Sequence, residues 1–226
     1  MDRLQVYQTV LDQGVVPLAY IDNADTARRV CDALYAGGLR SFEFTNRGVA
    51  AHKVFDVMAE HCREHYPDLA LGVGSVVDPP TAALYIALGA DFIVSPMLVE
   101  ELAPLCNRRK VGWMPGCFTP AEIGRAESLG AEIVKLFPGN AVAPGFIKSV
   151  LAPSPRTRIM VTGGVKPEVG NLRRWFGEGA VAVGMGSALL PKDLLAAGDY
   201  AGIERTSGEV LRMVGEVKRG AELLAH

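Results

Sequence analysis

The sequence has little of several features that would assign it to a specialised class of protein. Only four of its 226 residues are cysteine, and no two of them form a CxxC pair: Cys31, Cys62, Cys106 and Cys117. In a chain of this length, such spacing is typical of reduced thiols rather than of a disulfide framework. Lysine and arginine total 23 against 25 acidic residues, so a net charge of −2 offers no basic surface for nucleic acid or for a membrane.

Long apolar runs are also missing. No stretch reaches the roughly 18 apolar residues that a membrane-spanning helix requires. The first residues, Met1 to Gln5, carry charges and begin no apolar run, so a secretory signal peptide is not expected. We therefore expect a soluble cytoplasmic protein.

The length and composition predict one α/β domain over residues 1–226. About half of the residues (49%) are apolar and 21% are charged, which is ordinary globular composition. A chain of this length suits one barrel-sized domain better than two small ones, and it can bury a core without disulfides or structural metals. No linker or low-complexity tract interrupts it.

Short apolar runs alternate with longer amphipathic segments almost to the end of the chain. The runs predicted as strands are Val15–Tyr20, Ser41–Thr45, Leu69–Ser75, Phe92–Ser95, Gly112–Pro115, Ile133–Phe137, Arg158–Thr162 and Val181–Gly184. Segments with helical spacing lie between them, among them Ala24–Ala36, Ala50–His65, Pro80–Leu88 and Pro120–Leu129. Strands that are nearly continuous in apolar residues predict a parallel sheet covered on both faces. Eight of them favour a (β/α)8 TIM barrel over a doubly wound sheet.

The ends of the chain and the helix boundaries give further predictions. The segment before Val15 is expected to form an extra helix that caps the bottom of the barrel. Asn23 and Thr119 are candidate N-caps, and Gly37 is expected to end a helix. The tail, residues 201–226, is predicted to be helical, charged and exposed.

Lys135 is the one lysine, of seven, that lies inside an apolar strand run. Catalytic groups of barrel enzymes lie at the C-terminal ends of the strands and in the loops that follow. Burial favours the neutral form of an amine, and the neutral amine is the form that attacks a carbonyl carbon. Alternatively, the side chain snorkels out of the barrel mouth or pairs with an acid. The lysine alone does not decide between these interpretations.

The second strand run carries polar residues on one face. Alternation places Glu43, Thr45 and Arg47 opposite Phe42 and Phe44. A carboxylate inside a barrel is costly unless it is paired or protonated, and either condition suits a general acid–base. The Arg47 guanidinium, at the strand exit, suits bidentate binding of a carboxylate or phosphate. A structural Glu–Lys or Glu–Arg pair is the alternative, and the two interpretations overlap.

Three of the predicted strands end in glycine-rich segments: Gly72-Val73-Gly74-Ser75, Thr162-Gly163-Gly164 and Gly184-Met185-Gly186-Ser187. Turns after the seventh and eighth strands form the recurrent phosphate cradle of TIM barrels, because their backbone N–H groups face the ligand. Each glycine could instead serve only a tight turn. The occurrence of both turns in the last two strand positions favours phosphate binding.

A metal site is not expected. The segment His61-Cys62-Arg63-Glu64-His65 matches the H-x-x-E-H pattern of some zinc hydrolases, but it lies at the end of a helical segment and no third ligand is evident. The strand ends carry no His/Asp/Glu set that would hold a metal. The sequence therefore predicts neither a metal nor an organic cofactor.

Taken in order, the strand-end motifs resemble those of the 2-keto-3-deoxy-6-phosphogluconate (KDPG) aldolase family, some of whose members also cleave 4-hydroxy-2-oxoglutarate (KHG). The resemblance covers residues 15–191. The strand with Glu43, Thr45 and Arg47 is similar to the family's E-x-T-x-R strand. The other matches are Gly72-Val73-Gly74-Ser75-Val76 (G-x-G-T-V), Ser95-Pro96 (I-S-P), Met114-Pro115-Gly116 (I-P-G), Lys135-Leu136-Phe137-Pro138 (K-F-F-P), and the turns Thr162-Gly163-Gly164-Val165 and Gly186-Ser187.

The resemblance implies a role for each matched residue. Lys135 would be the Schiff-base nucleophile and Glu43 the general acid–base. The remaining matched positions would bind substrate: Arg47 and Ser75 the pyruvyl carboxylate, and Gly163, Gly164, Gly186 and Ser187 the distal phosphate. Pro96, of the Ser95-Pro96 turn, and Thr162, which precedes Gly163, would be substrate-binding as well. Known members are homotrimers, so a homotrimer is implied as well.

The chain departs from the family pattern mainly at the phosphate end. Ser75 replaces a threonine and keeps the hydroxyl, and Asn46 replaces a leucine beside Arg47. Gly139-Asn140-Ala141 stands where many members have Ala-Glu, and Ala188 stands where a tryptophan is frequent. Substrate identity is therefore less firmly implied than mechanism.

The resulting hypothesis is a class I aldolase that cleaves 2-keto-3-deoxy-6-phosphogluconate to pyruvate and glyceraldehyde 3-phosphate. The nearest alternatives are aldolases for 4-hydroxy-2-oxoglutarate or for the galactonate epimer. A phosphate-binding barrel isomerase or epimerase would share the glycine turns but would not need a lysine in the sixth strand. A non-catalytic phosphosugar-binding barrel would need neither Lys135 nor Glu43.

Overall fold

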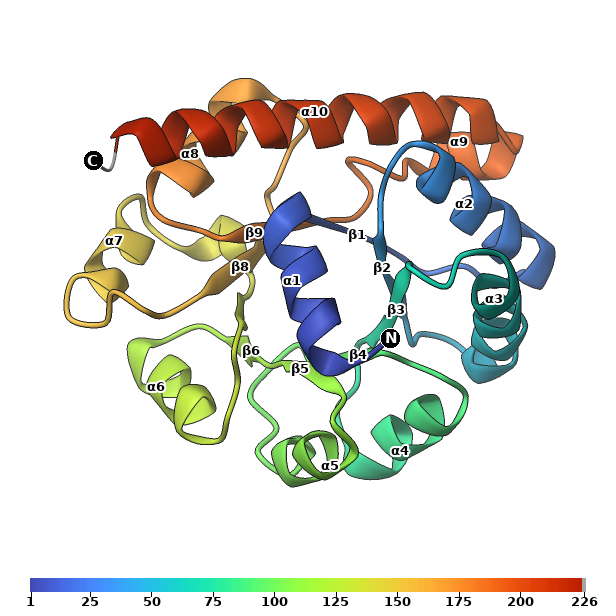
Figure 1. The fold of residues 1–226 in the computed structure, drawn as a ribbon, viewed down its shortest axis with the longest axis horizontal. Coiled ribbons are helices and arrows are strands. Elements are labelled where there is room, and N and C mark those ends of the chain that lie inside the picture. The colour runs from blue at the N-terminus through green and yellow to red at the C-terminus, as the bar shows by residue number, and fades with distance from the viewer. Residues whose placement is uncertain (225–226) are drawn as a thin grey trace.

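The structure, a computed structural model, describes residues 1–224 and confirms the predicted TIM-barrel fold (Figure 1). The strands are β1 (Val15–Ala19), β2 (Ser41–Thr45), β3 (Ala70–Gly74), β4 (Phe92–Val94), β5 (Gly112–Met114), β6 (Gly116–Cys117), β7 (Val134–Leu136), β8 (Ile159–Thr162) and β9 (Ala182–Met185). The helices are α1 (Arg3–Gln13), α2 (Ala24–Ala36), α3 (Ala51–His65), α4 (Pro79–Ala87), α5 (Leu102–Arg109), α6 (Pro120–Ser128), α7 (Phe146–Leu151), α8 (Val169–Gly177), α9 (Lys192–Ala197) and α10 (Tyr200–Leu224), with a 3₁₀ turn, η1, at Gly139–Ala141.

The sheet is parallel throughout, and its strands follow the order β5-β4-β3-β2-β1-β9-β8-β7-β6. Its two ends are β5, which corresponds to the predicted strand Gly112–Pro115, and β6, a short strand directly after Pro115 that was not predicted. Proline has no backbone N–H to donate, so the ladder breaks there, while the Pro115 carbonyl still accepts a bond from the Lys135 N–H at 2.9 Å. The chain itself thus closes the ring between β5 and β6.

The helix boundaries follow the predicted signals. The Asn23 side chain accepts a hydrogen bond from the Thr26 N–H at the start of α2, and Gly37 ends that helix. Thr119 and Glu122 form a reciprocal capping box at the start of α6. These local signals fix the helix ends, and therefore the loops that carry residues from strand ends into helices.

Helix α1 closes the N-terminal end of the barrel, as predicted, and lies across the ring of strands in Figure 1. Its side chains Val6 and Val10 are fully buried against the first residues of the strands. The Tyr7 hydroxyl accepts a hydrogen bond from the Trp113 N–H at 3.0 Å. Because this end is filled, a ligand is expected to reach the interior from the opposite end, where the strands terminate.

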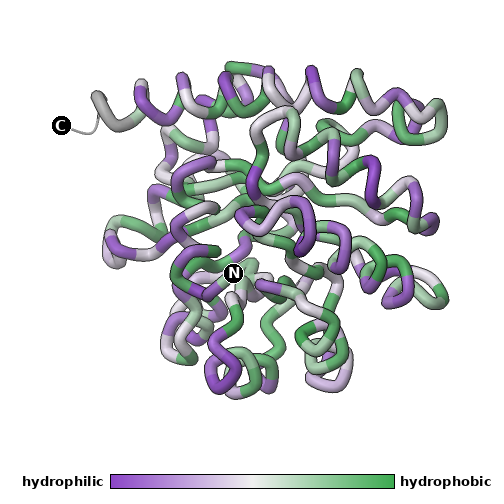
Figure 2. The backbone as a smooth tube through the Cα atoms, turned by 45° about the vertical axis from the view of Figure 1, so that its right-hand side comes forward, coloured by the Kyte–Doolittle hydropathy of each residue, from purple (hydrophilic) through white to green (hydrophobic). Residues whose placement is uncertain are grey.

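The prediction that the C-terminal tail is exposed was wrong for one face of α10. Ile203, Val210 and Val214 are fully buried, and the helix packs on α2 and α8. In Figure 2, hydrophobic and hydrophilic residues alternate along α10. The apolar residues recur at helical spacing and form one face of the helix, and charged residues lie between them in the sequence. Residues 225–226 of the predicted tail lie outside the described residues. None of the helices in the described chain, α10 included, is both long and apolar enough to cross a membrane.

The core has two parts, and their arrangement leaves room for a site. Outward-facing strand residues pack under the helices, as the contact of the Phe44 and Phe55 rings at 5.8 Å illustrates. A second cluster under α1 fills the lower barrel, with Val16, Phe92 and Met160 among its fully buried members. The inward-facing polar residues of the strands lie above this second cluster, toward the C-terminal end of the barrel.

Candidate active site

Lys135 and Glu43 meet inside the barrel. They come from β7 and β2, which stand opposite one another in the ring, and the Lys135 Nζ lies 3.6 Å from the Glu43 Oε1. The two side chains are only 7% and 1% exposed. An ammonium and a carboxylate at this depth compensate each other's charge, and a proton that moves between them would leave two neutral groups. The contact therefore fits both the structural and the catalytic interpretation of the pair.

Two glycines of β3 make space for interior side chains, and one of them, Gly74, makes space for the Glu43 carboxylate. A Cβ on Gly74, in the adjacent strand β3, would lie 1.8 Å from the Glu43 Oε1, which is impossible without displacement. A Cβ on Gly72 would lie 2.2 Å from the ring of Phe92. The two glycines of the G-x-G motif thus serve close approach of interior side chains, and neither has a positive φ.

We predict that Gly74→Ala lowers catalytic turnover about 100-fold, because a displacement of the Glu43 carboxylate by about 1 Å disrupts its alignment with the reacting atoms of a substrate. Gly124→Ala is the matched control, since a Cβ on Gly124 of α6 meets no atom within 4 Å. That control should gain about 1 kcal/mol of helix stability and keep wild-type turnover. Equal turnover in the two variants, measured with the same substrate, would contradict the account of Gly74.

Several polar atoms in the upper barrel have no hydrogen-bond partner within the described chain. They are both oxygens of Glu43 and the hydroxyls of Thr45, Ser95 and Thr162. Buried polar groups in folded proteins are almost always hydrogen-bonded, so a concentration of unpaired ones at a barrel mouth is typical of a site that binds a polar ligand. Glycine serves close approach here as well, because a Cβ on Gly184 would lie 2.3 Å from the Thr162 hydroxyl.

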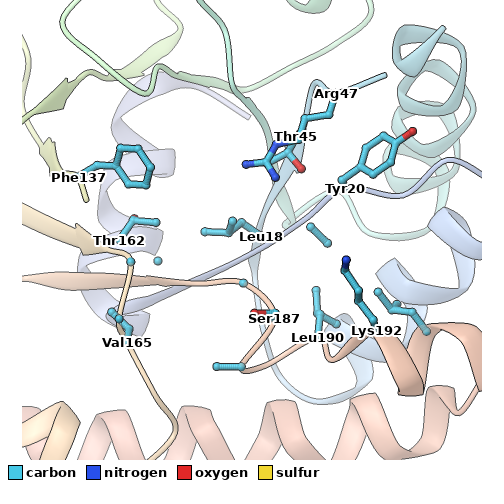
Figure 3. A pocket seen from close by; sticks show the side chains of 17 residues that line it. Leu18, Tyr20, Thr45, Arg47, Phe137, Thr162, Val165, Ser187, Leu190 and Lys192 are labelled. Carbon is cyan, nitrogen blue, oxygen red and sulfur yellow. The ribbon is translucent and has the colours of Figure 1, made fainter. Parts of the chain in front are cut away.

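A cavity of about 500 Å³, whose lining includes Thr45 and Thr162, opens at the C-terminal ends of β1, β2, β8 and β9 (Figure 3). It brings together six of the predicted site residues: Arg47, Thr162, Gly163, Gly164, Gly186 and Ser187. Lys135 and Glu43 do not line it directly. They connect to it through Phe137, whose ring centroid lies 5.3 Å from the Lys135 Nζ, and through Thr45, two residues beyond Glu43.

Two predicted binding residues lie outside this cavity. Ser75 follows β3 with a left-handed φ of 61°, a conformation that few non-glycine residues adopt. Pro96 follows β4, and its backbone packs so closely on Gly116 that a Cβ there would lie 2.4 Å from the Pro96 carbonyl carbon. Both stand at the correct end of the barrel, and their contact with substrate stays a prediction.

The turns after β8 and β9 form one wall of the cavity. Gly163 and Gly164 have positive φ values of 98° and 76°, and Asn140 of η1 packs against them. After β9, the Gly186 carbonyl accepts hydrogen bonds from the N–H groups of the two leucines that follow Ala188. Among the described residues, the N–H groups of Gly163, Gly164, Gly186 and Ser187 have no hydrogen-bond acceptor. This wall is therefore equipped to bind an anion through its backbone.

The departure at Asn46 has a structural explanation. Its side-chain oxygen accepts a hydrogen bond of 2.7 Å from the Tyr85 hydroxyl of α4. Burial raises the pKa of Tyr85 to about 12, so the hydroxyl keeps its proton and remains a donor. The bond fixes the exit of β2 immediately before Arg47.

The cavity lining also includes two polar side chains that the sequence analysis did not single out, those of Tyr20 and Lys192. Tyr20 follows β1, and its hydroxyl lies so close to Gly48 that a Cβ there would be 2.6 Å away. Lys192 begins α9 and is exposed to solvent at the cavity rim. In the sequence, Lys192 follows Pro191 shortly after the Gly186-Ser187 turn. This position is the only signal for a role of Lys192, and it does not distinguish Lys192 from an ordinary surface lysine.

The H-x-x-E-H segment has other contacts. The His61 Nε2 pairs with the Asp32 Oδ1 at 2.6 Å, and the His65 Nδ1 contacts the His61 carbonyl at 3.0 Å. The two imidazole rings stack at 4.5 Å. Within the described residues, no group of three or more His, Cys, Asp or Glu side chains is arranged to hold a metal ion.

Comparison with known proteins gives consistent matches over most of the chain. The family model for KDPG and KHG aldolase matches residues 6–206. A 2-dehydro-3-deoxy-phosphogluconate aldolase of Pseudomonas aeruginosa is 34% identical over 206 residues, 91% of each chain. The KHG/KDPG aldolase of Escherichia coli K12 is 31% identical over 90% of this chain and 94% of that protein. The crystal structure of the 2-keto-3-deoxy-6-phosphogluconate aldolase of Zymomonas mobilis with 3-phosphoglycerate has a TM-score of 0.78 at 26% identity, covering 91% and 94% of the two chains.

The parallel barrel, the polar upper interior and these relatives define a lyase of the TIM-barrel class. Within that class the chain belongs to the KDPG and KHG aldolase family, as its motifs predicted. Family membership leaves the choice among the substrates of the family open, because relatives named for KDPG alone and for both KHG and KDPG match this chain to a similar extent.

Proposed function

We propose that this protein is a class I aldolase that cleaves 2-keto-3-deoxy-6-phosphogluconate to pyruvate and glyceraldehyde 3-phosphate. The observation that carries the proposal is the contact of Lys135 with Glu43, 3.6 Å apart and buried beneath an open cavity. A buried amine beside a carboxylate supplies the nucleophile and the proton acceptor that Schiff-base chemistry requires.

In the proposed reaction the neutral Lys135 Nζ attacks the C2 carbonyl carbon of the substrate. The carbinolamine loses water and leaves a protonated imine between the lysine and C2. The imine withdraws electrons, so the C3–C4 bond breaks with its electron pair moving toward C3 to form an enamine. Lys135 therefore serves as the nucleophile, and the protonated imine that it forms serves as the electron sink.

Glu43 carries out the proton transfers of the same reaction. It accepts the proton of the C4 hydroxyl as the aldehyde leaves, and it then returns a proton to C3 of the enamine. Water adds to C2 of the resulting imine, and hydrolysis releases pyruvate and the free lysine. Both proton transfers need the carboxylate within reach of C3 and of the C4 hydroxyl, which accounts for the space that Gly74 leaves beside it.

The two anionic ends of the substrate have candidate partners on opposite sides of the cavity. The Arg47 guanidinium, at the exit of β2, would bind the carboxylate next to the reacting carbonyl. The free N–H groups of the Gly163-Gly164 and Gly186-Ser187 turns would bind the distal phosphate. The presence of 3-phosphoglycerate with the Zymomonas mobilis relative supports a phosphorylated ligand for this cavity.

The test is an assay of pyruvate release coupled to lactate dehydrogenase. We expect the highest kcat/KM for 2-keto-3-deoxy-6-phosphogluconate, a lower one for the phosphogalactonate epimer, and the lowest for 4-hydroxy-2-oxoglutarate, which has a carboxylate in place of the distal phosphate. A higher kcat/KM for 4-hydroxy-2-oxoglutarate would contradict the substrate assignment. Absence of pyruvate from all three would contradict the aldolase assignment and favour an isomerase or a binding protein.

We further propose a homotrimer built on the C-terminal face of the barrel. Val49, Val77, Met97 and Phe118 are 39–100% exposed, and they lie on the successive loops after β2, β3, β4 and β6. A row of exposed apolar side chains on adjacent loops is typical of an interface. A second copy of the chain is the partner that the family resemblance favours.

We predict that Met97→Glu shifts the protein from trimer to monomer, because a carboxylate at this position would be buried without a partner in the assembly. Sedimentation velocity measures the change. Leu4→Glu is the matched control, since Leu4 is 75% exposed on α1 at the opposite end of the barrel. A wild-type protein that sediments as a monomer, or equal masses for the two variants, would refute the proposed interface.

A further inference from the structure

Lys192 places a positive charge at the rim of the cavity, beside the glycine turns. Figure 3 shows its side chain at the lower edge of the cavity with Ser187, while Arg47 approaches from the upper edge. No carboxylate of the described residues lies within ion-pair distance of either the Lys192 ammonium or the Arg47 guanidinium. Both charges are therefore available to a ligand.

The segment that carries Lys192 is tied to the turn after β9. The N–H groups of Leu189 and Leu190 both donate to the Gly186 carbonyl at 2.9 Å, and both leucine side chains are buried. Pro191 then restricts the backbone immediately before Lys192. The ammonium thus extends from a position held close to the unpaired N–H groups of Gly186 and Ser187, and only its own side-chain torsions need to be fixed on binding.

The charged side chains that line the cavity are all cationic. Its lining contains Arg47 and Lys192 but no aspartate or glutamate. Arg47 lies two residues beyond β2, the strand that carries Glu43, whereas Lys192 lies in the segment that follows β9 and its glycine turn. A ligand with one anionic group at each end would satisfy both cations, and the anion at the Lys192 end would also meet the backbone N–H groups.

The chemistry of that second end favours a phosphate over a carboxylate. A phosphate monoester carries nearly two negative charges and three acceptor oxygens, while a carboxylate carries one charge and two oxygens. Four unpaired N–H groups and an ammonium match the larger number of acceptors and the larger charge. An unphosphorylated sugar acid would leave the ammonium and most of these donors without an anion.

We propose that Lys192 is a specificity-determining residue that binds the distal phosphate of the substrate and sets the preference for phosphorylated over unphosphorylated 2-keto acids. This inference rests on the proposed aldolase function and adds to it the residue that selects the phosphorylated substrate. Lys192 acts on binding and takes no part in the bond changes at Lys135, so its replacement should alter KM more than kcat.

The test compares cleavage of 2-keto-3-deoxy-6-phosphogluconate with that of unphosphorylated 2-keto-3-deoxygluconate. In Lys192→Met, we expect the ratio of kcat/KM for the phosphorylated over the unphosphorylated substrate to fall about 10-fold, as expected for loss of one charge-assisted contact at a solvent-exposed rim. Lys192→Arg should retain most of the ratio, since it keeps the charge. Lys166→Met is the matched control: Lys166 is exposed near the Gly163-Gly164 turn but does not line the cavity, and its loss should leave the ratio unchanged.

Calorimetric titration with inorganic phosphate provides a readout that does not depend on turnover. We expect the Kd of phosphate to rise about 10-fold in Lys192→Met and to stay at the wild-type value in Lys166→Met. An unchanged Kd and an unchanged substrate ratio in Lys192→Met would overturn the inference, and so would equal losses of kcat/KM on the two substrates. If the wild-type enzyme released no pyruvate from either substrate, the proposed function would fail, while the phosphate titration would still test Lys192.

Discussion

Replacement of Lys135 by methionine is expected to lower turnover by at least about 10⁴-fold, the magnitude typical of removing a covalent nucleophile. Methionine fills a similar volume within β7 but has no nitrogen to form the imine. Without the imine there is no electron sink for the C3–C4 bond, so no other group in the cavity substitutes for it. The coupled assay of pyruvate release measures the loss directly.

The same substitution changes stability, and the experiment must separate the two effects. Loss of the ammonium leaves the Glu43 carboxylate, 1% exposed, without its partner, which typically costs about 3–5 kcal/mol. The double variant Lys135→Met/Glu43→Gln carries no buried charge at the pair, so it should recover most of the unfolding free energy. It should remain inactive. Turnover above about 1% of wild type in folded Lys135→Met would exclude Lys135 as the nucleophile.

Replacement of Glu43 by glutamine should lower turnover by about 10²–10⁴-fold, the usual contribution of a positioned general acid–base. The amide matches the carboxylate in shape but does not accept the C4 hydroxyl proton or return a proton to C3. Exchange of the pyruvate methyl protons with deuterium, followed by NMR, reports the C3 step alone. This exchange should slow by a similar factor.

Thr45→Val is a suitable control for the Glu43 experiment. Thr45 follows Glu43 on the same face of β2, and its buried hydroxyl has no partner in the described chain. Its loss removes a polar group near the site but no proton-transfer group, so methyl exchange should fall far less than in Glu43→Gln. If Glu43→Gln kept the wild-type rate of exchange, the carboxylate would be a structural partner of Lys135 only.

Much of the barrel could be predicted because its signals are local. Apolar strands alternate with capped amphipathic segments, and the ends of the eight predicted strands lie within one residue of their predicted positions, while the short strand β6 was not predicted. The buried face of α10 could not be assigned with the same ease. Ile203, Val210 and Val214 are separated by charged residues, and only packing against α2 and α8 explains which side is buried.

The site was predictable to the extent that strand order determines it. Once β2 and β7 are the second and sixth strands of an eight-membered ring, inward-facing residues such as Glu43 and Lys135 point toward one another. Ser75 and Pro96 do not line the cavity. Their positions depend on side-chain packing and loop conformation, which strand order does not specify. Lys192 lies in a charged segment outside the strands, so only its position in three dimensions reveals it.

The central claim is that Lys135 forms the covalent intermediate, and borohydride trapping tests it most directly. The protein is incubated with pyruvate and sodium borohydride, digested, and mapped by peptide mass spectrometry. The account predicts one reduced pyruvate adduct on the peptide that contains Lys135, and none in Lys135→Met. An adduct on a different lysine, or no adduct in a protein that releases pyruvate from its substrate, would contradict it.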